Sequence, residues 1–375
     1  MRNNYKPIGN YIQPIDERNN SLRDLPLVGL SISKEFIPSI ANTIGTDMTS
    51  YRVIRKNQFA YSGVTSRNSD KITIALFTDY DEALISQAYT PFSVIDENKL
   101  NSEYLMMWFR RPEFDRYARF KSHGSAREIF DWEELCETLI PVPSISTQRA
   151  IVAEYNTLQN RIDNNQKIIQ KLEETAQAVY KEWFVENRDE EWEKKPFTEV
   201  LKFGGGGTPD TQNMNFWNGD IPFFTPADIS IGFYCIDTEK KITELGLQKS
   251  STKLYPKNTI FVTARGTVGA VALAGNSMAM NQSCYSITGK HPFFANQLTL
   301  ATISTLKNEA VGAVFAALVT KDFDNQFVIS PDEKIQEKFD NQVSSIYDMI
   351  LLKTQENQKL NELKTLLLSK LAKGE

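Results

Sequence analysis

The sequence predicts an α/β protein in which two globular units alternate with two long helices. A heptad pattern of apolar residues fills one of the predicted helices, and the same pattern returns 188 residues later in the other. Strand-like runs bounded by turn residues precede each helix. We therefore expect globular domains at 1–145 and 191–328, and helices at 146–190 and 329–375. The helices would pair as an antiparallel coiled coil, related by a pseudo-twofold internal repeat.

The first long helix is predicted from residues that recur at alternating steps of four and three. They are Ile151, Tyr155, Leu158, Ile162, Asn165, Ile169, Leu172, Ala176, Val179 and Trp183. Pro141 and Pro143 prevent the helix from starting earlier, and Ser144 or Ser146 is a suitable cap. About 40 residues make a helix of roughly 60 Å, which needs a partner for its apolar seam.

The second long helix supplies that partner within the same chain. Its repeated residues are Phe339, Val343, Ile346, Ile350, Lys353, Asn357, Leu360, Lys364, Leu367 and Leu371. We expect Ser330 to cap it, Pro331 to occupy its first helical position and Glu333 to complete a capping box. Asn165 aligns with Lys353, so each helix carries a polar residue in mid-seam. Such a polar layer reduces stability but fixes the register of the pair.

Composition limits the class of protein. A chain of 375 residues is long enough for two domains and the helices, and its net charge is −5. Cys136, Cys235 and Cys284 have no metal-ligand spacing and cannot all pair, which favours a reducing cytoplasm. The longest apolar run, residues 310–319, is too short to cross a membrane.

The first unit combines predicted strands with a basic, aromatic helical stretch. Strands are expected within 51–61, 72–77 and 92–95, and a helix from Tyr104 to Phe120 should break at Pro112. Basic and aromatic side chains alternate between residues 108 and 127, as they do in many phosphate-binding surfaces. The alternative is an amphipathic helix whose aromatic residues lie in the core. For the basic side chains, both interpretations remain open.

The second unit contains loops with unusual glycine content. Residues 204–207 are four consecutive glycines, and residues 265–269 read Arg-Gly-Thr-Val-Gly after a predicted strand at 259–262. Glycines allow a backbone to approach a ligand closely, often a phosphate. Arg265 on such a loop could reach a base edge or a phosphate. The alternative for each loop is a tight turn or bulge.

Enzyme motifs are weak or absent in this sequence. The glycine run superficially matches a methyltransferase loop, but the chain contains no Pro-Pro pair for the partner motif. Asp210, Glu239 and Lys241 could imitate a nuclease carboxylate set, although such sparse matches often arise by chance. There is no P-loop, and the two histidines, His123 and His291, have no visible partners.

Several stretches of the two units form a recognisable set. In the second unit they are Gly205-Gly206-Thr208-Pro209, with one glycine inserted, and residues 216–222 (FWNGDIP), 225–226 and 265–269. In the first unit they are residues 29–38, 58–62, 86–89 and 123–128. With these stretches the chain resembles, over nearly its whole length, the specificity subunit of type I restriction–modification systems. The first unit lacks the Gly-Gly-Thr-Pro signature, which implies that the two units read different sequences.

The resemblance implies that each unit is a target-recognition domain that reads one half of a bipartite double-stranded DNA site. The helices would set the spacer and bind two methyltransferase subunits, which bring S-adenosylmethionine, while restriction subunits bring ATP and Mg²⁺. The chain itself would hold no cofactor, have no catalytic residue and no metal site, and lie in the cytoplasm. The residues expected at DNA are Arg67, Gln87, Ser125, Arg127, Thr208, Thr211, Arg265 and Gln282. Those expected to bind partners are Leu352, Leu363, Leu366 and Leu368.

Two other classes of function remain as alternatives. A stand-alone DNA-cleaving or DNA-modifying enzyme could use the heptads as a dimer seam, and it would act on DNA without other subunits. A structural coiled-coil adaptor would bind no DNA with or without a methyltransferase partner.

Overall fold

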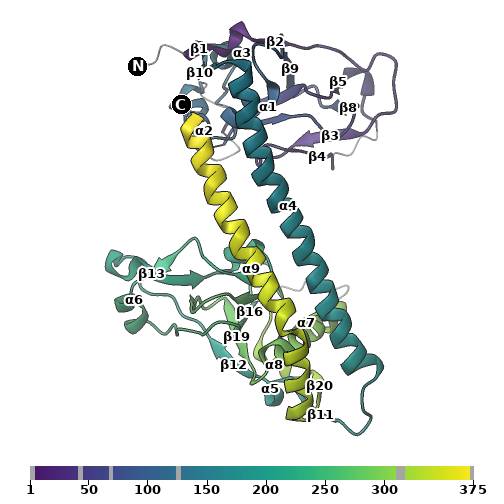
Figure 1. Ribbon diagram of the computed structural model, residues 1–375, viewed down its shortest axis with the longest axis vertical. Coiled ribbons are helices and arrows are strands. Elements are labelled where there is room, and N and C mark those ends of the chain that lie inside the picture. The colour runs from purple at the N-terminus through teal and green to yellow at the C-terminus, as the bar shows by residue number, and fades with distance from the viewer. Residues whose placement is uncertain (1–4, 41–44, 67–70, 124–127, 310–316, 372–375) are drawn as a thin grey trace. The chain divides into compact units, whose positions relative to one another are not determined.

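The computed structural model describes residues 5–40, 45–66, 71–123, 128–309 and 317–371. The chain divides into two compact units: unit 1 is Met1–Asn160 with Leu360–Glu375, and unit 2 is Arg161–Lys359. The long helices α4 (Ile145–Lys181) and α9 (Glu333–Leu371) contribute residues to both units (Figure 1). Each compact unit therefore contains part of both long helices together with its own sheets.

Unit 1 is built on two four-stranded sheets, of order β2-β9-β6-β7 and β4-β3-β8-β5. Their strands are β2 (Ile12–Pro14), β3 (Leu27–Leu30), β4 (Phe36–Pro38), β5 (Arg52–Arg55), β6 (Phe59–Ser62), β7 (Thr73–Leu76), β8 (Glu82–Ile85) and β9 (Thr90–Val94). Along β6, Phe59 and Tyr61 enter one apolar core and Ala60 enters another. Because side chains alternate across a strand, this sheet separates two cores.

The helices of unit 1 are α1 (Ser102–Phe109), α2 (Pro112–Lys121) and α3 (Trp132–Glu137), and a two-stranded sheet joins β1 (Tyr5–Pro7) to β10 (Leu139–Pro141). The break predicted at Pro112 is confirmed, since α2 begins there. The Asn101 side chain caps α1 by accepting from the Tyr104 N–H at 3.0 Å. Nearly all of α1 is buried, so it forms part of the core.

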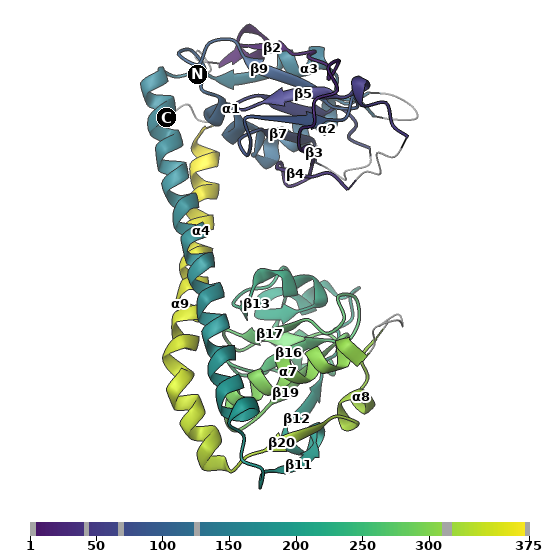
Figure 2. The same cartoon turned by 90° about the vertical axis from the view of Figure 1, so that its right-hand side faces the viewer.

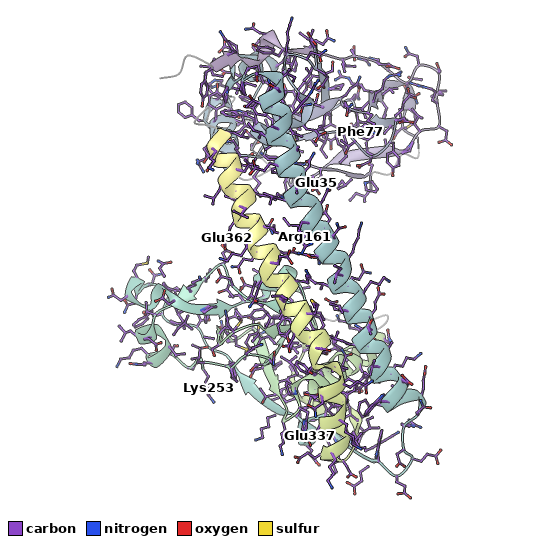
Figure 3. All side chains as sticks on the ribbon, viewed as in Figure 1. Glu35, Phe77, Arg161, Lys253, Glu337 and Glu362 are labelled. Carbon is purple, nitrogen blue, oxygen red and sulfur yellow. The ribbon has the colours of Figure 1, made fainter. Side chains whose placement is uncertain are left out.

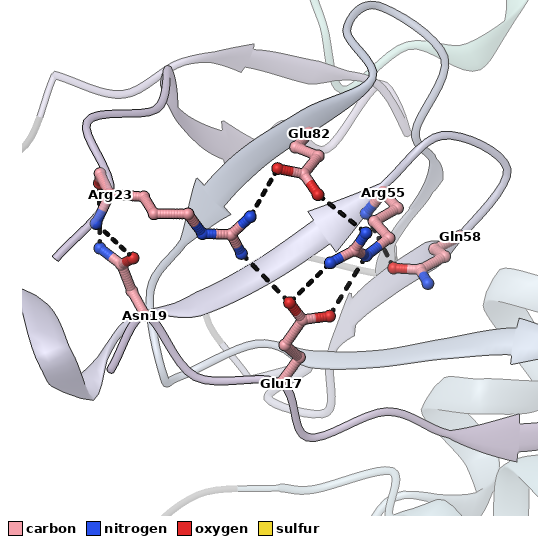
Figure 4. Close-up of polar contacts among 6 residues, drawn as sticks. All are labelled: Glu17, Asn19, Arg23, Arg55, Gln58 and Glu82. Atoms are coloured by element: carbon pink, nitrogen blue, oxygen red, sulfur yellow. Dashed lines mark hydrogen bonds and ion pairs between the residues drawn. The ribbon is translucent and has the colours of Figure 1, made fainter. Parts of the chain in front are cut away.

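Four charged side chains brace the loop before β3 against strands β5 and β8 (Figure 4). Glu17 pairs with Arg55 at 2.7 Å and with Arg23 at 3.1 Å. Glu82 pairs with the same two arginines, at 2.8 and 2.7 Å. The Arg55 hydrogen bond lowers the pKa of Glu17, so this network is intact at neutral pH.

Unit 2 contains a five-stranded sheet of order β12-β19-β16-β17-β14 and a three-stranded sheet of order β15-β13-β18 (Figure 2). A two-stranded sheet pairs β11 with β20. The strands are β11 (Glu193–Pro196), β12 (Lys202–Gly205), β13 (Trp217–Phe224), β14 (Tyr234–Cys235), β15 (Lys241–Ile242), β16 (Ile260–Thr263), β17 (Val271–Ala274), β18 (Ala279–Met280), β19 (Cys284–Thr288) and β20 (Phe327–Ser330). On β16, Ile260 and Val262 face the main core, and Phe261 faces a smaller one.

Besides the long helices, unit 2 contains α7 (Pro292–Glu309) and the short helices α5 (Phe197–Val200), α6 (Glu244–Gln248) and α8 (Thr320–Asp324). The N-terminus of α7 is capped from α9, because the Asp340 carboxylate accepts from the N–H groups of Phe293 (3.1 Å) and Phe294 (2.7 Å). Burial raises the pKa of Asp340 despite these two bonds. The cap fixes α7 to the long helix.

Within unit 2, α4 and α9 run side by side in opposite directions. Arg161, labelled in Figure 3, binds Glu356 at 2.6 Å. In the π-helical turn Glu182–Glu186 that follows α4, the ring of Phe184 lies 5.2 Å from that of Phe339. Between these contacts, buried Asn165 donates to Asn357 at 2.9 Å. The expected polar residue of the first helix is therefore buried between the helices, but its hydrogen-bond partner is Asn357.

Two hydrogen bonds of unit 1 have counterparts in unit 2 at an offset of 188 or 189 residues. The Ile8 N–H donates to the Thr138 carbonyl, and the Phe197 N–H likewise donates to the Gln326 carbonyl, both at 2.9 Å. The Gln148 side chain donates to the Pro143 carbonyl at 2.9 Å, and the Gln336 side chain likewise donates to the Pro331 carbonyl at 2.8 Å. The two-stranded sheets also share a register, since Pro7 faces Leu139 and Pro196 faces Phe327. Equivalent backbone geometry thus surrounds the start of each long helix.

The starts of the long helices test the predicted caps. Ser144 caps α4, as expected, by accepting from the Thr147 N–H at 3.3 Å. The prediction of Ser330 as the cap of α9 is wrong. Ser330 pairs with Glu193 in the two-stranded sheet, and α9 begins at Glu333, after Asp332. Strand pairing therefore outweighs the local capping signal there.

Glu173 on α4 gives a prediction about stability and pH. Burial, with a smaller contribution from Glu174, raises its pKa to about 7. The folded protein therefore keeps a proton that the unfolded chain loses, so this group lowers the free energy of unfolding as pH rises from about 4.5 to 7. Glu173→Gln should stabilise the protein by about 1–2 kcal/mol at pH 8 and hardly at all at pH 4.5. Urea unfolding at both pH values measures this; an equal gain at both would contradict it.

Candidate nucleic-acid interface

Within the glycine run at 204–207, Gly206 and Gly207 are packed closely by neighbouring backbone. A Cβ on Gly206 would lie 2.1 Å from the Asn281 carbonyl oxygen, and one on Gly207 would lie 2.8 Å from the Thr252 nitrogen. The Gly207 N–H already donates to the Met280 carbonyl at 3.1 Å. Close packing therefore accounts for Gly206 and Gly207, whereas Gly204 and Gly205 belong to strand β12. The Gly207 N–H is not free for a phosphate.

Two further segments brace this run. The Tyr255 hydroxyl donates to the Gly205 carbonyl at 2.7 Å, and the Thr252 hydroxyl donates to the Met280 carbonyl at 2.7 Å. Segments 204–208, 251–255 and 278–283 therefore form one hydrogen-bonded group of loops. Neither Thr252 nor Tyr255 was singled out from the sequence, because no local pattern reveals contacts between distant loops.

Arg265 is exposed on a tight turn after β16. Gly266 and Gly269 adopt positive φ angles of 79° and 70°, which favour glycine. The buried Thr263 hydroxyl holds the turn by bonding the Thr267 carbonyl and by accepting from the Ala270 N–H at 3.0 Å. The turn is thus rigid while the guanidinium projects into solvent.

Gln282 lies at the same end of the sheet as Arg265. Thr263 pairs with Cys284 across β16 and β19, and the next residues continue this contact, since the Ala264 N–H donates to the Ser283 carbonyl at 2.8 Å. The Gln282 amide oxygen accepts from the Thr208 hydroxyl. The structure therefore brings together three of the predicted residues, Thr208, Arg265 and Gln282. Thr211 is exposed three residues beyond Thr208.

Unpaired cations accompany these loops. Lys249, Lys253, Arg265 and Lys307 form no ion pair with any residue that the structure describes. Lys253, labelled in Figure 3, follows the bracing Thr252, and the Lys307 side chain lies against Gly269. Free cations beside exposed polar side chains suit an anionic ligand such as a nucleic-acid backbone. The three lysines were missed because their charges are scattered along the sequence.

Of the residues predicted at DNA in unit 1, Gln87 lies in the part of the chain that the structure describes. Arg67, Ser125 and Arg127 lie outside the described residues, whereas Gln87 is exposed in the turn after β8. The Thr65 N–H donates to the Glu128 carbonyl at 3.0 Å, and its hydroxyl bonds the Ser122 hydroxyl at 2.8 Å. The described residues Thr65, Ser122 and Glu128 therefore lie together.

The basic stretch of α2 is largely neutralised within unit 1. Arg119 pairs with Glu128, and Lys121 pairs with Glu134 at 2.9 Å. Among the aromatic residues, Trp108 and Phe109 at the end of α1 and Phe114 in α2 are buried, Tyr117 is half-buried, and Phe120 is 82% exposed. The core interpretation is thus confirmed for Trp108, Phe109 and Phe114. Charge pairing makes this stretch less basic than its local sequence suggests.

Three of the four leucines expected to bind partners are exposed on α9. Leu352, Leu363 and Leu366 are 56%, 50% and 57% exposed. Leu368 is instead half-buried against the core of unit 1, because it lies on the helix face turned toward that core.

Among the described residues, no group of three or more His, Cys, Asp or Glu side chains is arranged to hold a metal ion. Lys241 of the supposed nuclease set pairs with Asp237 at 3.0 Å.

The sequence matches the family described as type I restriction modification DNA specificity domain, over residues 34–174 and 189–362. The chain belongs to this family. It is 28% identical over 194 residues to the type I restriction enzyme MjaIX specificity subunit of Methanocaldococcus jannaschii, a match that covers 50% of this chain and 45% of that relative. It is 23% identical over 406 residues to the HindI specificity subunit of Haemophilus influenzae, covering 86% and 87%.

A solved specificity-domain structure has a similar fold. The S subunit of a type I restriction–modification system from M. genitalium superposes with a TM-score of 0.57 at 12% identity, covering 98% of this chain and 95% of that one. The predicted family and α/β composition are therefore confirmed. The family is one of recognition components, so the chain is a specificity subunit and not a catalytic one. Within the described ranges, no helix has the length and apolarity needed to span a bilayer.

Proposed function

We propose that this specificity subunit reads a bipartite double-stranded DNA site, one half with each unit. The proposal rests on the family match over both halves of the chain, 34–174 and 189–362. In unit 2 it is supported by the exposed side chains of Arg265 and Gln282, which are of the types that read base edges in the major groove. The free lysines nearby suit phosphate contacts. In unit 1 the corresponding proposal is for Arg67, Gln87, Ser125 and Arg127.

The helices α4 and α9 are proposed to pair as an antiparallel coiled coil that sets the spacer between the half-sites. The Arg161–Glu356 and Asn165–Asn357 contacts support this pairing in unit 2, and the Lys364 bond to Gln159 supports it in unit 1. The hydrogen bonds repeated at an offset of 188 or 189 support a pseudo-twofold internal repeat. We keep 1–145 and 191–328 as recognition domains, with the helices at 146–190 and 329–375.

Two methyltransferase subunits are proposed to bind the helices, with exposed Leu352, Leu363 and Leu366 among their contacts. Those subunits would bring S-adenosylmethionine and flip the target adenine, and restriction subunits would bring ATP and Mg²⁺.

The protein is proposed to lie in the cytoplasm, which suits the free thiols of Cys136, Cys235 and Cys284.

Lengthening both helices tests the proposed spacing. A heptad inserted after Asn160 and another after Lys359 leave the internal contacts of each unit intact. Seven residues add about 10 Å, so we expect a gap up to about three base pairs wider with unchanged half-sites. Methylation mapping of a host that carries the complex measures the gap.

Four-residue insertions at the same two points are the control. They introduce a stutter that unwinds the seam, so we expect a gap about one base pair wider or loss of methylation. Changed half-site bases with an unchanged gap would show that the helices do not set the spacer. A wild-type complex that methylates no bipartite site would contradict the proposed function as a whole.

A further inference from the structure

We infer that Thr208 is a positioning residue that holds the Gln282 amide in the orientation needed to read one adenine. This inference rests on the proposed function of unit 2, and it goes further by assigning separate tasks to two neighbouring side chains. The observation behind it is the hydrogen bond from the Thr208 hydroxyl to the Gln282 amide oxygen. Both groups are exposed, so this bond does not anchor an apolar core.

The backbone on both sides of this bond is fixed. Gln282 lies in a turn closed by Asn281, whose side-chain oxygen accepts from the Ser283 N–H at 3.0 Å. The Asn281 N–H in turn donates to the Phe224 carbonyl at 3.0 Å. Thr208 directly follows Gly207, whose N–H donates to the Met280 carbonyl, and the preceding Gly206 packs against Met280 and Asn281. The two side chains therefore meet from rigid supports.

The hydrogen bond decides which end of the amide faces outward. The hydroxyl occupies one lone pair of the Gln282 oxygen, leaving the second lone pair and the Nε2 hydrogens for a ligand. An acceptor beside a donor matches the N6 and N7 positions of adenine in the major groove. A free glutamine would lose rotamer entropy on binding, whereas this side chain is already ordered.

Arg265 is the neighbouring cation and has a different task. It projects from the adjacent turn and forms no ion pair with a described residue. It can contact the next base or a phosphate while Gln282 reads the adenine. The role assigned to Thr208 therefore predicts a defect confined to one base position, whereas loss of a phosphate contact would weaken all sites alike.

The test uses the whole complex with its methyltransferase partner and a set of duplexes in which each base of the half-site is varied in turn. Thr208→Val keeps the shape of the side chain but loses the hydroxyl. We expect it to reduce discrimination for adenine at one position roughly fivefold or more, with the other positions unchanged. Thr208→Ser should retain wild-type discrimination, because the hydroxyl remains. The matched control is Thr305→Val, which should change nothing. Thr305 lies on a helix surface, and its hydroxyl bonds the Ala301 carbonyl.

A double variant separates positioning from direct contact. Gln282→Ala should lose discrimination at the same position, and adding Thr208→Val to it should have no further effect. Additive losses, a uniform loss at all sites, or a defect at a base other than adenine would each overturn the inference. Failure of the wild-type complex to methylate a bipartite site would instead overturn the proposed function. A working wild type that tolerates Thr208→Val would overturn this inference alone.

Discussion

Gly206→Ala is expected to destabilise unit 2 by about 3 kcal/mol, the upper end of the cost of overpacking. The added methyl group would lie 2.1 Å from the Asn281 carbonyl oxygen and 2.5 Å from that of Met280. Both atoms belong to backbone held by strand and turn hydrogen bonds, so neither can move away cheaply. Urea unfolding followed by tryptophan fluorescence should show a clearly lower midpoint.

Gly205→Ala is the matched control. Gly205 lies in the same run, in strand β12, and an added Cβ would meet nothing within 4 Å. We expect its stability to remain close to that of the wild type. Equal losses for Gly205→Ala and Gly206→Ala would show that chain flexibility, and not close packing, is the reason for the glycines.

Asp340→Ala should cost about 3 kcal/mol, because it removes a charged acceptor from two buried N–H groups. The N-terminus of α7 would lose its cap, and the amides of Phe293 and Phe294 would remain unsatisfied in the core. Thermal unfolding measures the overall loss. Hydrogen exchange should show faster exchange at these two amides in particular.

Two variants control for the Asp340 prediction. Asp340→Asn keeps one side-chain acceptor and should have an intermediate stability. Glu333→Gln removes an acidic group from the same helix, where its ion pair with Lys290 is exposed, and should have no measurable effect. Equal stabilities for the Ala and Asn variants would show that helix capping is not the source of the loss.

The sequence by itself determined the elements whose signals are local or periodic. Heptad spacing predicted both long helices, and α4 runs from Ile145 to Lys181. Pro112 marked the break between α1 and α2, and strand β16 lies close to its predicted position. These signals survive because the rigid ring of proline and the repeat of apolar side chains act over a few residues.

The tertiary structure decided which partner each polar or charged group meets. Asn165 bonds Asn357, Arg119 is neutralised by Glu128, and Ser330 joins a strand instead of capping a helix. The contact of Thr208 with Gln282 joins residues 74 positions apart. A hydrogen bond or ion pair depends on distances of a few ångströms, which are fixed by packing between distant segments and leave no periodic trace in the sequence.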